Sequence, residues 1–233
     1  QVAGAVRDTV EYAATVALRE LSAVIDNPVV LDDGRISSNG NFHGAPVAYV
    51  LDFLAIAVAD LGSIAERRTD RALDKNRNAG LPPFLADDPG VDSGLMIAQY
   101  TQAALVSENK RLATPASVDS IPSSAMQEDH VSMGWSAARK LRKVVDNLAR
   151  ILAIELVTAA RAIEFRTGLE PAPATARQAR REGRGVLGAA HAAGRREVGR
   201  TIAASSLGPA RVAARVGGER SAQAGRRKCA GAV

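Results

Sequence analysis

Apolar residues recur at intervals of three and four along most of the first 166 residues, which is the spacing of one face of an α-helix. The first such pattern covers residues 6–24 and ends at Asp26-Asn27-Pro28, because the residue before a proline disfavours the helical region. The second covers residues 47–65, and the charged cluster at residues 66–71 continues it toward a loop rich in Asn, Gly and Pro. Two long helices are therefore predicted in the first third of the chain.

Two further helical patterns follow. The third begins after Ser93, which is expected to be its N-cap, and should stop near Thr114-Pro115. The fourth covers residues 141–163 and is expected to begin near Val131. The alternation of a strand occurs only in residues 29–37, where Asp32-Asp33-Gly34 predicts a short hairpin. The pattern as a whole predicts an all-α fold, a bundle of long, nearly parallel helices.

Charge divides the chain near Arg166. The whole sequence has a net charge of +5, but residues 1–166 carry −4 and residues 167–233 carry +9. All aromatic residues and all methionines lie before residue 167, and the tail is rich in Ala, Arg and Gly. Such a composition buries too little apolar surface to offset the entropy of the chain. We therefore predict a helical domain over residues 1–166 and a disordered or poorly structured basic tail over residues 167–233.

Two interpretations of the tail remain open. In the first, which we favour, the tail is the product of a shifted reading frame. In the second, the tail is a basic arm that contacts nucleic acid through phosphates. Nucleic acid is not expected as a partner, because no aromatic residue lies among the tail's arginines.

We expect a cytoplasmic protein without a membrane span, since no uninterrupted apolar stretch approaches 18 residues and the single cysteine is Cys229. The initial Gln1 suggests that the chain begins within a longer reading frame.

Two polar segments between the helices lack periodicity and are the candidates for function, since binding groups are commonly carried by loops at helix ends. They are residues 37–44 and residues 114–130. The second ends in Gln127-Glu128-Asp129-His130 at an expected helix start, where an acidic residue such as Asp129 could simply favour the helix dipole. The two histidines of these segments have no third ligand at a metal-binding spacing, so no metal is expected.

Several segments together resemble the C-terminal half of the histidine ammonia-lyases, a branch of the aromatic amino acid lyase family, in the form found in actinobacteria. The resemblance covers about seven-tenths of the chain, to about Phe165. Its motifs are Asp26-Asn27-Pro28, Gly40-Asn41-Phe42-His43-Gly44, Glu66-Arg67-Arg68, Gly80-Leu81-Pro82-Pro83-Phe84-Leu85, Ser93-Gly94-Leu95-Met96, Ala116-Ser117-Val118-Asp119-Ser120 and Gln127-Glu128-Asp129-His130. The mostly helical bundle of that family agrees with the periodicity.

The resemblance implies a specific chemistry and a prosthetic group. Ammonia is eliminated from histidine by removing a weakly acidic β-proton, which requires an electrophile to draw electron density away. The family forms this electrophile, a methylidene-imidazolone, from its own Ala-Ser-Gly segment. No Ala-Ser-Gly occurs in these 233 residues. The family also implies a homotetramer whose sites draw residues from more than one subunit.

The site residues implied by the resemblance come from both polar segments. Glu128 matches the family's active-site glutamate, which binds polar groups of the substrate and assists proton transfer, and Phe42 matches an aromatic residue that lines the pocket. Gln127, His43 and Asn41 are expected beside them as substrate-binding or loop-shaping residues. An ordinary core role for Phe42 remains the alternative.

The resemblance thus predicts the C-terminal portion of an enzyme that converts L-histidine to trans-urocanate and ammonia, inactive alone. Two alternatives stay open. The chain could be a non-catalytic truncated homologue that joins intact subunits, or part of a phenylalanine or tyrosine lyase or aminomutase, since these share the scaffold.

Overall fold

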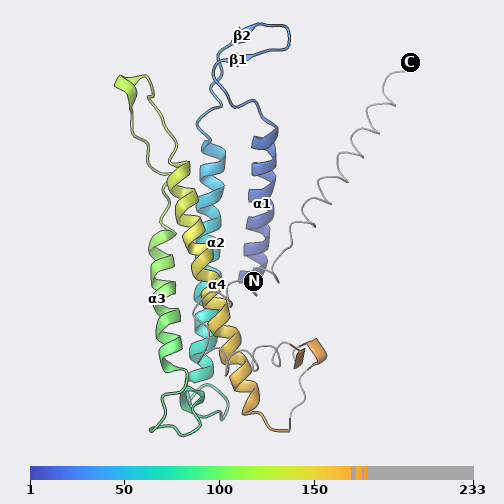
Figure 1. Ribbon diagram of the computed structural model, residues 1–233, viewed down its shortest axis with the longest axis vertical. Coiled ribbons are helices and arrows are strands. Elements are labelled where there is room, and N and C mark those ends of the chain that lie inside the picture. Colours follow the sequence, from blue (N-terminus) through green and yellow to red (C-terminus); the bar gives the residue numbers. More distant parts are fainter. Residues whose placement is uncertain (169–171, 175, 178–233) are drawn as a thin grey trace, which may run out of the picture. The chain divides into compact units, whose positions relative to one another are not determined.

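Four long α-helices form the bundle of the structure, a computed structural model that describes residues 1–168, 172–174, 176 and 177 (Figure 1). They are α1 (Val2–Ser22), α2 (Ala45–Leu73), α3 (Met96–Leu112) and α4 (Gly134–Glu164). The two-residue strands β1 (Val29–Val30) and β2 (Ile36–Ser37) pair antiparallel, with Val29 opposite Ser37. The all-α bundle and the short hairpin predicted from the sequence are both confirmed.

Helix α2 is the centre of this arrangement. It packs most extensively against α4 and also contacts α1 and α3. Its buried face is built from small residues, including Ala48, Ala55, Ala59 and Gly62, so that neighbouring helices can approach closely. A Cβ on Gly62 would lie 3.2 Å from Cδ1 of Ile151, which shows how near α4 comes. Below this contact, Ala65, Val106 and Ile151 form an apolar cluster of α2, α3 and α4.

Polar side chains fix the register between α3 and α4. The buried amide of Gln102 donates a 2.8 Å hydrogen bond to the carbonyl of Ile151. About one turn before Ile151 on α4, the side-chain amide of Asn147 donates a 2.9 Å hydrogen bond to Asn109 Oδ1 on α3. Both amides are fully buried. Because a buried amide without a partner is costly, a sliding of α3 past α4 would carry a free-energy penalty.

Helix α2 departs from one expectation of the sequence. Its length and composition are those of a helix that could cross a membrane, with a mean hydropathy of 1.9 in its most apolar window, whereas no such segment was expected. A core helix of a bundle meets the same criteria, so this is weak support for a span. The helix also contains two buried carboxylates, Asp52 and Glu66, and ionisable residues are rare in membrane-spanning helices.

The predicted helix starts need two corrections. Ser93 does not cap α3, which begins at Met96, because Gly94 takes a positive φ of 51° and interrupts the helical path. Helix α4 begins at Gly134, three residues later than expected. The boundary near Arg166 falls just after the end of α4, and the tail expected from residue 167 lies almost entirely outside the described residues.

Candidate functional site

The loop before α2 is shaped by asparagine side chains. Asn39 donates to the carbonyls of Val24 and Asp26 at 3.0 and 2.9 Å, and its own N–H donates to Asn27 Oδ1 at 3.1 Å. The backbone N–H of Asn41 then donates to Asn39 Oδ1 at 3.0 Å. These bonds hold residues 39–41 against the end of α1, so Asn41 lies in a fixed turn and is exposed.

Phe42 and His43 come next and stand together at the start of α2. Gly44 follows with φ 72° and ends the loop, and Pro46 lies in the first helical turn, where its missing N–H has no cost. The rings of Phe42 and His43 have centroids 4.4 Å apart and are tilted by 39°. Phe42 remains 39% exposed, so it is not a core aromatic in the described structure.

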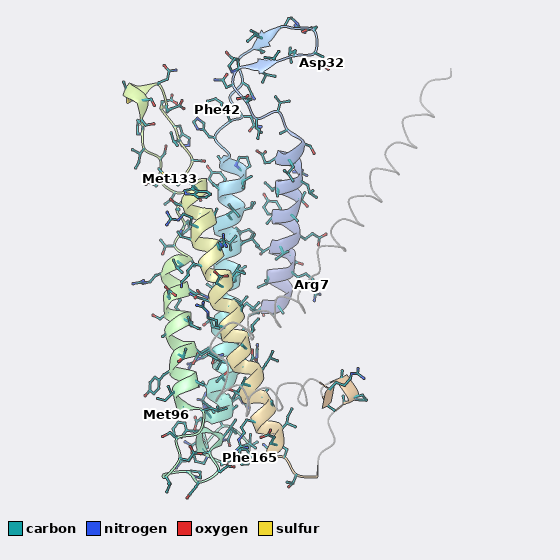
Figure 2. The ribbon with its side chains drawn as sticks, in the orientation of Figure 1. Arg7, Asp32, Phe42, Met96, Met133 and Phe165 are labelled. Carbon is teal, nitrogen blue, oxygen red and sulfur yellow. The ribbon has the colours of Figure 1, made fainter. Side chains whose placement is uncertain are left out.

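Glu128 reaches the same place from the segment between α3 and α4. Its Oε2 lies 3.9 Å from Nε2 of His43, and the side chains are 37% and 23% exposed respectively. The contact is an ion pair only when the imidazole is protonated. His43 and Glu128 are 85 positions apart in the sequence and meet at one end of the bundle. Figure 2 labels Phe42 and Met133 on neighbouring elements at this end.

The segment holding Glu128, residues 113–133, is a loop with little regular structure. A 3₁₀ turn over Ser124–Met126 is closed by two backbone hydrogen bonds between Ser123 and Glu128, of 2.9 and 3.3 Å. At the far end of the loop, Ser132 Oγ donates a hydrogen bond to the carbonyl of His43. This bond attaches the loop beside the imidazole that Glu128 approaches.

The residues around Glu128 lie in the loop and not in a helix. The backbone N–H of Gln127 donates to the Ser124 carbonyl at 3.1 Å, while Gln127, Asp129 and His130 are exposed. The helix-start interpretation of Asp129 was wrong, because α4 begins at Gly134 and its first turn has no acidic residue. A capping role therefore explains neither Glu128 nor Asp129.

Sequence reasoning missed a buried carboxylate beneath this loop. Asp52 of α2 is 2% exposed, accepts a 2.7 Å hydrogen bond from the N–H of Ser117, and lies 3.3 Å from Nζ of Lys140 on α4. Burial alone would raise the pKa of Asp52, but the hydrogen bonds from Ser117 and Lys140 outweigh it and lower the pKa. The signal was present in the sequence, since Asp52 occupies a core-facing position of an apolar helix.

Chemically, these groups form one wall of a site. An exposed aromatic ring can pack against a flat substrate, the imidazole can orient a neighbouring carboxylate, and Glu128 can accept a proton or bind an amine. Within the described residues, no three His, Cys, Asp or Glu side chains gather closely enough to hold a metal ion. The wall is open to solvent, so a substrate would need further groups to enclose it.

Comparisons with known proteins agree on one family. The family described as "Aromatic amino acid lyase" matches residues 1–184. A histidine ammonia-lyase of Streptomyces coelicolor is 80% identical over 175 residues, which are 75% of this chain and 34% of that protein. A histidine ammonia-lyase of Symbiobacterium thermophilum is 60% identical over 176 residues, with the same coverage. The chain therefore spans about a third of the length of the curated relatives it matches.

Solved structures give the same result at lower identity. The crystal structure of histidine ammonia-lyase from Trypanosoma cruzi superposes with a TM-score of 0.78 at 39% identity, covering 88% of this chain and 42% of that one. Tyrosine aminomutase from Streptomyces globisporus superposes with a TM-score of 0.74 at 41% identity, covering 77% and 34%. Structural likeness alone does not separate the two activities.

Proposed function

Since the chain belongs to the aromatic amino acid lyase family, we propose that it is the C-terminal portion of a histidine ammonia-lyase, which converts L-histidine to trans-urocanate and ammonia. The high identity to proteins of that name, 80% in Streptomyces coelicolor, supports histidine as the substrate. The cytoplasm is the compartment we propose.

One observation carries the proposal. Phe42, His43 and Glu128 come from two distant segments and converge at one exposed end of the bundle. These are three of the five site residues that the resemblance implied; contacts of Asn41 and Gln127 with them are not part of this observation. In the proposed reaction, Phe42 contacts the substrate ring, Glu128 binds a polar group or takes a proton, and His43 holds the Glu128 carboxylate in place.

The prosthetic group of the family would complete this wall. When bound, a methylidene-imidazolone acts as the electrophile that makes loss of the amino group and of the β-proton feasible. The open wall of Phe42 and Glu128 fits a position beside such a group, but these 233 residues contain no Ala-Ser-Gly from which to form it. We therefore propose that this chain is inactive alone and contributes residues to a site completed by another segment.

Reconstitution tests the proposal. The purified chain is combined with the Ala-Ser-Gly-containing N-terminal portion of a Streptomyces histidine ammonia-lyase, and urocanate formation is followed by its absorbance. Turnover is expected from the mixture and not from either part alone. Turnover by the 233-residue chain by itself would refute the claim that it lacks the electrophile. A mixture that forms a stable complex without turnover would refute the assignment as a lyase portion.

Substrate choice needs its own comparison, because a tyrosine aminomutase shares the fold at 41% identity. The reconstituted enzyme is offered histidine, tyrosine and phenylalanine at equal concentrations. We expect histidine to give the highest kcat/KM. A preference for tyrosine or phenylalanine would keep the family assignment and reassign the substrate.

A second candidate function is that of a non-catalytic interaction subunit. Large apolar side chains are exposed on several helices, including Leu21, Tyr49, Phe53 and Trp135, at 83%, 57%, 46% and 78%. Exposed apolar surface of this kind favours association, either with the remaining part of a lyase or in a tetramer. Sedimentation of the chain at tens of micromolar tests this candidate, and a well-behaved monomer would count against it.

A further inference from the structure

The loop over residues 113–133 cannot keep its shape through local preferences alone. Three consecutive residues that are not glycine, Ser124, Ala125 and Met126, take positive φ angles of 54°, 53° and 71°. Residues with a Cβ disfavour this left-handed region, and each of the three residues therefore adds an unfavourable contribution to the free energy of folding. These residues lie immediately before Gln127 and Glu128, so a relaxation of the turn would move Glu128 away from His43.

Asp52 connects this loop to the rigid part of the bundle. It lies about two turns into α2, and its Oδ2 accepts the Ser117 N–H at 2.7 Å. Its Oδ1 lies 3.3 Å from Nζ of Lys140, and Lys140 also donates to the carbonyl of Thr114. One carboxylate and its lysine thus join α2 and α4 to two points in the first part of the loop.

Packing alone does not account for a carboxylate at this position. The neighbouring core positions of α2, Ala48 and Ala55, are small and apolar, and Asp52 is as deeply buried as they are. A buried charge is unfavourable unless it is fully paired, and an apolar side chain would often serve the core as well. The useful property of Asp52 is therefore its ability to accept hydrogen bonds from the loop backbone and from Lys140.

The remainder of the loop is attached at its other end. Ser132 Oγ bonds to the His43 carbonyl, and the N–H of Val131 donates to Ser120 Oγ at 3.0 Å. Glu128 lies between these attachments and the Asp52 attachment. Release of either end would give the strained turn room to relax.

We propose that Asp52, acting with Lys140, is a positioning residue that fixes the 113–133 loop and thereby holds Glu128 beside His43. This inference rests on the proposed function in so far as Glu128 serves a reaction. The attachment itself is a property of the chain and can be measured without turnover.

Amide hydrogen exchange on the full chain tests the attachment. Asp52→Asn keeps the size of the side chain and removes its charge. We expect exchange of the amides of Ser117, Asp119 and Glu128 to accelerate in this variant at least ten times more than exchange of the α3 amides, whose acceleration reports the general loss of stability. The matched control is Glu155→Gln, which breaks another ion pair between α2 and α4, that with Arg68, far from the loop. The control should leave loop exchange as in the wild type.

Two exchange results would overturn the proposal. One is unchanged loop protection in Asp52→Asn, and the other is an equal acceleration in the loop and in all helices, which would mean general destabilisation. If Asp52→Asn does not fold, Lys140→Gln replaces it, because this variant keeps the Ser117 bond to Asp52 and removes the ammonium that contacts both Asp52 and the Thr114 carbonyl. It should accelerate exchange of the loop about threefold, and unchanged protection would again overturn the proposal.

Turnover in the reconstituted enzyme adds a separate readout. Asp52→Asn should lower kcat at least tenfold, while Glu155→Gln should change it less than twofold. An active Asp52→Asn enzyme with a loosened loop would refute the positioning of Glu128 by Asp52. An inactive wild-type reconstitution would refute the proposed function, whereas the exchange result would still decide whether Asp52 holds the loop.

Discussion

Gly94 lies directly against the backbone of Phe84. The N–H of Leu95, the next residue, donates a 2.9 Å hydrogen bond to the Phe84 carbonyl, and Gly94 has φ 51°. A Cβ on Gly94 would overlap that carbonyl oxygen and would lie 2.9 Å from the backbone N of Ala86. The close approach connects the loop before α3 to the 3₁₀ turn Pro83–Leu85.

Gly94→Ala should therefore destabilise the chain strongly. Both the overlap with backbone atoms and the left-handed φ oppose a side chain here, and a loss of about 2–4 kcal/mol in the free energy of unfolding is expected. Urea unfolding measures it. The control is Gly80→Ala, where φ is 86° but nothing lies within 4 Å of the added Cβ. Equal losses in both variants would show that the contact with Phe84 is unimportant.

Met126 supplies a prediction of the opposite sign. It has φ 71° and is 67% exposed, so its side chain contributes little packing while its backbone is strained. Asparagine tolerates the left-handed region, and Met126→Asn should stabilise the chain by about 0.5–1 kcal/mol. Met126→Leu should leave the urea midpoint unchanged, because leucine disfavours the left-handed region as methionine does. A loss of stability in Met126→Asn would contradict the left-handed backbone strain at residue 126.

The helices follow from the sequence because each has a periodic apolar face and a clear stop. The apolar positions of α1 end just before Asn27-Pro28, and the helix ends at Ser22. Helix starts were less predictable. Ser93 has the side chain of an N-cap, but the contact of Gly94 with Phe84 determines the backbone conformation there. These two residues are ten positions apart, so a local sequence pattern does not reveal their contact.

The candidate site was predictable only in part for the same reason. Phe42 and Glu128 were found through family motifs, since no periodicity links positions 42 and 128. Their approach depends on Asp52 with Ser117, and on Ser132 with the His43 carbonyl, both of which join distant segments. A charged residue on the apolar face of a predicted helix, as at Asp52, is the local signal that could have indicated such an attachment.

Asp52 also predicts how stability depends on pH. Its pKa in the folded chain is lowered because hydrogen bonds from Ser117 and Lys140 outweigh burial. A carboxyl whose folded pKa is below its unfolded pKa contributes stability that is complete above the unfolded pKa, about 3.9, and is lost as the pH falls through the folded pKa. The wild type should therefore exceed Asp52→Asn in unfolding free energy by about 2–3 kcal/mol at pH 7, and the difference should shrink below about pH 4.

Urea unfolding at pH 7 and at about pH 3 checks this sign. Asp60→Asn, which removes an exposed carboxylate from the same helix, is the matched control and should track the wild type at both pH values. A difference between wild type and Asp52→Asn that stays constant or grows on acidification would contradict the assignment of a stabilising, ionised Asp52.

Glu128→Gln separates a catalytic carboxylate from a structural one. Gln keeps the size of the side chain but cannot accept a proton or carry charge. In the reconstituted enzyme kcat should fall by roughly two to four powers of ten, the range for a positioned acid or base. Stability should change little, because the Glu128 side chain is 37% exposed and its ion pair with His43 is 3.9 Å long.

Asp129→Asn is the control for that substitution, because it removes one charge from the adjacent exposed residue. It should leave kcat within about threefold of the wild type. Turnover and melting temperature are compared for both variants. If Glu128→Gln retains near-normal turnover, or if Asp129→Asn loses as much activity, then Glu128 is not the proton-accepting group. Since α4 begins only at Gly134, a helix-dipole role could not then be offered for Glu128 either, and its 3.9 Å contact with His43 would be its remaining function.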